Sequence, residues 1–139
     1  MTHWIHPFFV HFSVAFLVAG AALEAWGAVR REDSALASPL VIAGTISLVA
    51  TLASGYLAAN AVTLSEAARP LLAAHERNGW FVLGVFVSGL FGRAWIGRAL
   101  RPGERALYAT WLTFGAALAL RSAWFGGRMV YEQGVGVGL

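Results

Sequence analysis

Four histidines are the side chains of this chain best suited to chemistry, because imidazole binds transition metals and titrates near neutral pH. His3, His6 and His11 lie close together at the start of the chain, and His75 lies near its middle. The chain contains no Cys, which excludes thiolate metal sites and disulfides. A bound metal or cofactor would therefore depend on imidazole ligands.

Long apolar stretches must position these histidines. Of the 139 residues, 58% are hydrophobic and 12% are charged, whereas ordinary soluble domains carry about 25% charged residues. A hydrocarbon core of about 30 Å needs roughly 20 apolar residues in a helix. We therefore predict an all-α membrane protein with one domain over residues 1–139, an up-down bundle of four transmembrane helices. The predicted spans cover residues 7–29, 39–62, 72–97 and 104–126, and a C-terminal cap covers 127–139.

The four prolines support these boundaries. Pro7, Pro39, Pro70 and Pro102 each lie at or just before the start of one predicted span. Proline suits the first helical turn, where its missing N–H would have no partner anyway.

The charges predict an orientation and exclude one class of partner. All ten basic residues are Arg, and they lie between apolar runs instead of clustering on one face, which argues against nucleic-acid binding. More of them follow the first and third spans than lie on the opposite side, where the histidines are. The positive-inside rule then places both termini and all four histidines outside the cytoplasm.

Haem b is the cofactor that this arrangement favours. His11 and His75 come from different predicted helices at matching depth, as two axial ligands of a haem between helices do. We therefore predict that His11 and His75 bind the haem iron. His6 and Tyr131 are predicted to support these ligands or to carry protons. Further predicted site residues make space for the macrocycle or hold it by polar contacts, namely Gly55, Gly79, Asn78, Arg77, Arg121 and Arg128.

Two other interpretations stay open. Zn or Cu could bind His3, His6 and His11 with His75, although His6 and His11 are five residues apart and so lie on different sides of a regular helix. Alternatively, the histidines are only hydrogen-bonded and the chain is an accessory subunit of a larger membrane complex. The serines form no nucleophile–base arrangement, so we predict no catalytic residue and favour electron transfer over catalysis.

Both ends of the chain resemble motifs of a bacterial membrane family, domain of unknown function 2231 (DUF2231). Residues 6–12, HPFFVHF, resemble its HPxxVHFP opening, and residues 126–137, GGRMVYEQGVGV, resemble its GGxLVYxxGVGV close. Gly55, His75 and Asn78 match further positions, whereas Ser13 stands where the family commonly has proline. The resemblance spans essentially the whole chain. It implies a four-helix membrane domain, sometimes found beside iron–sulfur modules, which favours a redox role without establishing an activity.

These observations together predict a small cytochrome in the bacterial inner membrane. We expect it to pass electrons between the quinone pool and an exported or membrane-bound partner protein. Its other predicted contacts are the lipid bilayer and either further copies of itself or the subunits of a larger complex.

Overall fold

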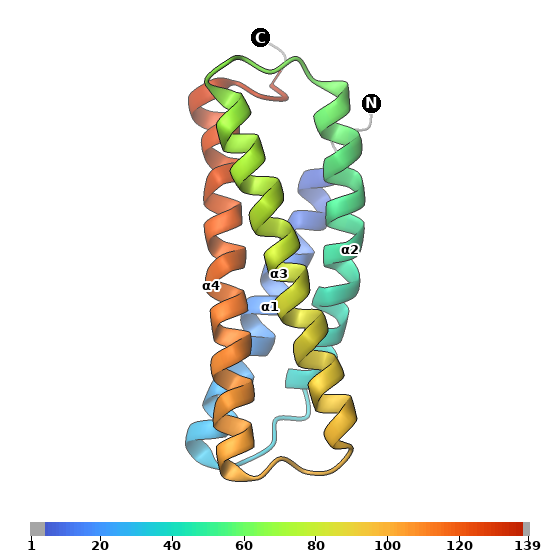
Figure 1. The fold of residues 1–139 in the computed structure, drawn as a ribbon, viewed down its shortest axis with the longest axis vertical. Coiled ribbons are helices and arrows are strands. Elements are labelled where there is room, and N and C mark those ends of the chain that lie inside the picture. Colours follow the sequence, from blue (N-terminus) through green and yellow to red (C-terminus); the bar gives the residue numbers. More distant parts are fainter. Residues whose placement is uncertain (1–4, 138–139) are drawn as a thin grey trace.

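Four antiparallel helices make up the described part of the chain, residues 5–137, in this computed structural model (Figure 1). Their bounds are α1 Ile5–Arg30, α2 Ala37–Ala61, α3 Ala68–Ile96 and α4 Pro102–Gln133. The prediction of an all-α four-helix fold is therefore confirmed. We call the end of the bundle where α1 begins and α4 ends the termini end, and the end with the α1–α2 and α3–α4 connections the loop end (Figure 1).

The helices pack as two hairpins. α1 packs most extensively on α2, and α3 on α4; α1 also packs along α4, and α2 packs less extensively on α3. Within the described residues the backbones of α1 and α3 do not come into contact. α1 and α3 therefore lie diagonally across the bundle. This arrangement matters for the site, because residues from α1 and α3 can meet only in the centre of the bundle.

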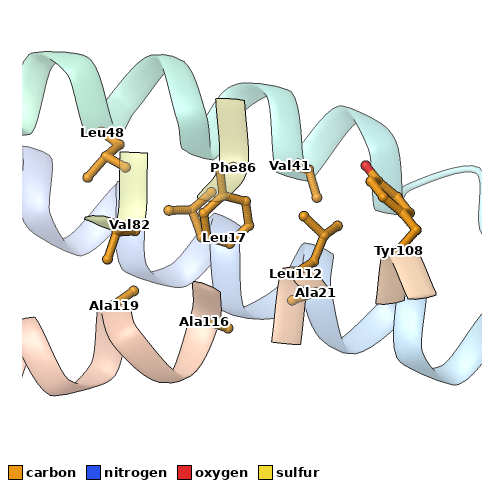
Figure 2. Packing of buried hydrophobic residues seen from close by; sticks show 10 residues of the cluster. All are labelled: Leu17, Ala21, Val41, Leu48, Val82, Phe86, Tyr108, Leu112, Ala116 and Ala119. Carbon is orange, nitrogen blue, oxygen red and sulfur yellow. The ribbon is translucent and has the colours of Figure 1, made fainter. Parts of the chain in front are cut away.

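Close packing of apolar side chains fills that centre. Leu17, Val41, Phe86 and Leu112, one from each helix, are almost completely buried, and Figure 2 shows them with six further members of the cluster. Gly44 lets α1 approach α2, since a Cβ there would lie 2.7 Å from Leu17 Cδ2. In lipid such close packing holds helices together, because hydrophobicity does not drive their association there.

Three of the helices, α1, α2 and α3, are long and apolar enough to cross a membrane, with hydropathies of 1.8, 1.8 and 1.5. Large apolar side chains such as Phe91 and Trp95 are exposed on the outside of the bundle, as a lipid-facing surface requires. α4 is not among the three candidate spans, and its arginines, Arg121 among them, lower its hydropathy. Since α4 runs the length of the bundle beside α3 (Figure 1), we expect it to cross with its neighbours.

The main departure from the predicted boundaries is at the end of α4. The helix continues through Gln133 and stops at Gly134, which has φ 64° and donates its N–H to Val130 O at 3.1 Å. Glycine adopts this left-handed conformation without steric cost. The helix thus extends seven residues into the segment that the sequence predicted as a cap.

Candidate functional site

Two histidine rings meet at the termini end of the bundle. His6 lies in the first turn of α1 and His75 lies in α3; their ring centroids are 6.1 Å apart and their planes are at 89°. Because α1 and α3 are diagonal, the two imidazoles bridge the centre of the bundle. α2 and α4 supply the groups that hold them.

The ring of His6 is held by α2. Its Nδ1 lies 3.0 Å from Thr51 O and 3.3 Å from Ser54 Oγ, while the Ser54 hydroxyl itself donates to Thr51 O at 3.0 Å. A carbonyl oxygen can only accept, so we assign the proton of the neutral ring to Nδ1. This leaves the lone pair on Nε2. Ser13 of α1 fixes the same turn of α2, with its Oγ 3.1 Å from Thr51 Oγ1.

The ring of His75 is held by α4 in the same manner. Its Nδ1 lies 2.9 Å from Ser122 O and 3.2 Å from Ser122 Oγ, and this hydroxyl donates to the main-chain oxygen of His75 at 3.3 Å. The same argument assigns the proton to Nδ1 and the lone pair to Nε2.

A glycine one helical turn further on makes room for each ring. A Cβ on Gly55 would lie 2.9 Å from His6 Cε1, and one on Gly126 would lie 3.4 Å from His75 Cε1. Both hairpins thus repeat one arrangement, in which a hydroxyl residue supplies the carbonyl and a glycine follows four residues later, Thr51 with Gly55 and Ser122 with Gly126. The roles of Thr51, Ser122 and Gly126 at the pair were not predicted from the sequence. The repeated spacing was the signal that could have revealed them.

His11 lies elsewhere, on the exposed surface of α1. Its Nδ1 is 2.6 Å from Pro7 O, so the ring folds back on its own helix. Five residues of an α-helix turn through about 500°, which places His11 some 140° around α1 from His6. The structure therefore pairs His75 with His6, whereas the sequence predicted His11. The other predicted histidine ligand, His3, lies outside the described residues.

The predicted polar partners divide between the bundle and its surface. Asn78 is buried and donates from Nδ2 to Leu118 O at 2.6 Å, so it ties α3 to α4 one turn away from His75. Tyr131 is 91% exposed, and Arg77 is exposed as well. Arg121 is also exposed, with its guanidinium over the Phe125 ring at 5.3 Å. These three side chains therefore do not gather around the histidine pair.

Arg128 already has a carboxylate partner. Its Nε lies 2.8 Å from Glu132 Oε1, and its guanidinium covers the Trp124 ring at 5.0 Å. The hydrogen bond from Arg128 lowers the pKa of Glu132. Arg128 thus binds Glu132 and covers Trp124 on its own helix, and its guanidinium does not point to the histidine pair as a propionate partner would.

The space around the pair fits a bare ion better than a macrocycle. The open side of Gly55 holds the His6 ring, and that of Gly79 holds Leu52, whose Cδ2 would lie 2.9 Å from a Cβ. A haem would have to displace these side chains. Two imidazoles on opposite sides of one metal ion, with metal–nitrogen distances of about 2.0 Å, have centroids about 6 Å apart whether the ion is bare or held in a haem, and the separation here is 6.1 Å. The packing around the two glycines is therefore what favours the bare ion. Within residues 5–137 no cluster of three or more His and carboxylate side chains exists, so the pair supplies two ligands.

Comparison with known proteins identifies a family. A family model described as "Predicted membrane protein (DUF2231)" matches residues 2–139. No curated protein and no solved structure matches the chain.

Proposed function

The chain belongs to the DUF2231 family of predicted membrane proteins, and within that membrane bundle we propose that His6 and His75 bind one transition-metal ion through their Nε2 atoms. The observation that carries the proposal is the pair itself, with rings 6.1 Å apart and both Nδ1 atoms bound to main-chain carbonyls. Metal-binding histidines characteristically donate the other ring N–H to such a carbonyl, which fixes the tautomer and the ring orientation.

Copper suits this donor set better than zinc. Imidazole binds both metals, but protein zinc sites usually take three or four protein ligands, and the described residues supply two. Copper(I) accepts two opposed nitrogen ligands. A copper ion would give the site a one-electron couple, so the role we propose is electron transfer, with the quinone pool and a membrane or exported redox protein as exchange partners.

Haem b remains a second candidate for the same pair. Its axial ligands would then be His6 and His75, and opening the bundle for the macrocycle would move Leu52 away from Gly79. The favourable observation is again the pair of imidazoles from two helices, each with a free Nε2. We favour the bare ion over haem because the open sides of Gly55 and Gly79 are already filled by His6 and Leu52.

A structural role is the alternative without a cofactor. The bonds from Nδ1 to Thr51 O and Ser122 O already satisfy one polar atom of each partly buried ring. In that case the pair would only join the two hairpins, and the chain would act as an accessory subunit of a larger membrane complex.

Metal titration of the detergent-purified full chain distinguishes these functions. We expect the wild type to bind one copper ion per chain, with His6→Ala and His75→Ala each lowering the affinity by at least 100-fold. His11→Ala is the matched control, because His11 lies on the same helix but is exposed and bonded to Pro7. A Soret band in the purified protein, absent from His6→Ala and His75→Ala, would assign haem instead. A folded protein that binds neither copper nor haem would favour the structural role.

A further inference from the structure

A second candidate site lies at the loop end of the bundle, far along the helices from the histidine pair. It is a cavity of about 200 Å³ lined by residues from the end of α1, the α3–α4 connection and the start of α4. These residues are Ala28, Arg31, Leu100, Pro102 and Arg105. Its lining thus combines two arginines with three apolar residues.

One nitrogen of the Arg105 guanidinium forms an ion pair, and another has no hydrogen-bond partner among the described residues. Its side chain is 12% exposed, and its Nη2 forms an ion pair with Asp33 Oδ1 at 2.6 Å. Its Nη1 is buried and has no hydrogen-bond partner in the structure. A buried donor without a partner costs free energy, on the order of 1–3 kcal/mol. Nη1 has almost no accessible surface, so it would donate to an acceptor in the cavity only after the guanidinium turned toward it, and that hydrogen bond would then be stabilising.

Arg31 faces the same cavity and forms none of the ion pairs within residues 5–137. It is the one non-glycine residue of the described chain with a positive φ, 60°, directly after α1. This conformation is uncommon for a side-chain-bearing residue. Glu104, the nearest carboxylate on α4, is held by Arg98 at 2.7 Å and so does not neutralise Arg31.

Tryptophans place this cavity at the depth of lipid headgroups. Trp26, near the end of α1, is 63% exposed, and Trp95, near the end of α3, is 93% exposed. Tryptophan concentrates where hydrocarbon meets water, because its ring is apolar and its N–H is polar. An anion that reaches the cavity therefore arrives most readily on a lipid.

We propose that this cavity binds the phosphate group of an anionic phospholipid between the guanidinium groups of Arg31 and Arg105. A guanidinium offers a planar fork of N–H donors that matches phosphate oxygens, and basic pockets between membrane helices recognise lipid headgroups in this way. The volume is that of several water molecules, enough for a phosphate and its ester oxygens. Ala28 and Leu100 would contact the glycerol side of the lipid.

Native mass spectrometry of the detergent-solubilised full chain tests the proposal, with phosphatidylglycerol and phosphatidylcholine as probes. We expect phosphatidylglycerol to bind more tightly than phosphatidylcholine, and Arg31→Gln to weaken phosphatidylglycerol about fivefold to tenfold. Arg30→Gln is the matched control, because Arg30 lies over the Trp26 ring at 5.6 Å and does not line the cavity. Equal affinities for the two lipids, or equal effects of the two arginine variants, would overturn the proposal.

Two further arms complete the test. Asp33→Asn removes the carboxylate that competes for Arg105 and should strengthen phosphatidylglycerol binding; unchanged or weaker binding counts against the site.

Inorganic phosphate is added as a competitor of phosphatidylglycerol and, separately, as the only ligand. If millimolar phosphate displaces the lipid and binds as tightly by itself, the ligand is free phosphate and the lipid assignment is wrong. Copper binding at the histidine pair should not change in any of these variants.

Discussion

Each imidazole of the histidine pair is held at one nitrogen and left open at the other. Thr51 O and Ser122 O fix the two Nδ1 atoms, while Gly55 makes the room that the His6 ring occupies. The geometry of the pair therefore depends on small groups of α2 and α4 as much as on the histidines. Changing one of these groups should disturb metal binding without removing a ligand.

Gly55→Ala tests this dependence. The new Cβ would lie 2.9 Å from His6 Cε1, so the ring must move away from Thr51 O. We expect at least a tenfold loss of copper affinity and a loss of stability of about 1–3 kcal/mol from overpacking. Copper titration and thermal unfolding in detergent measure the two effects.

Gly84→Ala is the control for that substitution, because a Cβ at Gly84 has nothing within 4 Å. It should leave copper affinity unchanged and stabilise α3 by up to about 1 kcal/mol through helix propensity. Equal copper affinities in the Gly55→Ala protein and the wild type would show that the His6 ring is not held as described.

The choice between His6 and His11 could not be predicted from the sequence. α1 is apolar on nearly all sides, so its pattern does not reveal which face packs inward. Only the contact with α2 brings the His6 face into the bundle and leaves His11 outside. His75 and Gly55, in contrast, are residues that the sequence predicted at a site, and both lie at the pair.

The helices themselves were largely predictable, because apolar length and the prolines mark each start. The end of α4 was not, because the sequence predicted that the last span ends at Gly126 and that a cap begins at Gly127. In the structure the helix continues through both glycines, at a cost of about 1 kcal/mol each relative to alanine. Gly126 packs against the His75 ring, and the Arg128–Glu132 pair spans the next turn. These contacts outweigh the local preference for a turn.

The hydrogen bond from Asn78 to Leu118 O joins α3 to α4 near the site. Asn78→Leu keeps the branched outline of the side chain, although leucine is larger, and removes this bond. We expect the free energy of unfolding to fall by about 1 kcal/mol, the magnitude of interhelical hydrogen bonds in membranes. Denaturant titration in mixed detergent micelles measures the change.

Asn60→Leu serves as its control, because among the described residues the Asn60 amide donates to Tyr56 O of its own helix, at 2.8 Å, on an exposed surface. Its substitution should change stability little. A fall as large as that of Asn78→Leu would show that the interhelical bond contributes nothing specific.

Taken as one body, the bundle has two chemically different ends. The histidine pair lies at the termini end, and the cavity lined by Arg31 and Arg105 lies at the loop end. The arginine distribution predicts that the loop end faces the cytoplasm. The proposed metal site would then face the outer side of the membrane, and the proposed lipid phosphate would bind at the cytoplasmic end.

Single-cysteine labelling tests this orientation, and the absence of native Cys makes each introduced thiol unique. Thr63→Cys lies in the α2–α3 connection at the termini end, and Ala35→Cys in the α1–α2 connection at the loop end; both positions are exposed. A membrane-impermeant thiol reagent should label Thr63→Cys in intact bacterial cells and Ala35→Cys only after lysis. The opposite pattern would reverse the orientation.

X-ray absorption at the copper edge tests the central claim most directly, namely that His6 and His75 together bind one metal ion. The copper-loaded wild type should show nitrogen neighbours at about 2 Å with the outer-shell scattering of imidazole. That signature should disappear from His6→Ala and persist in His11→Ala. A spectrum without imidazole scattering, or one that survives in His6→Ala, would contradict the account.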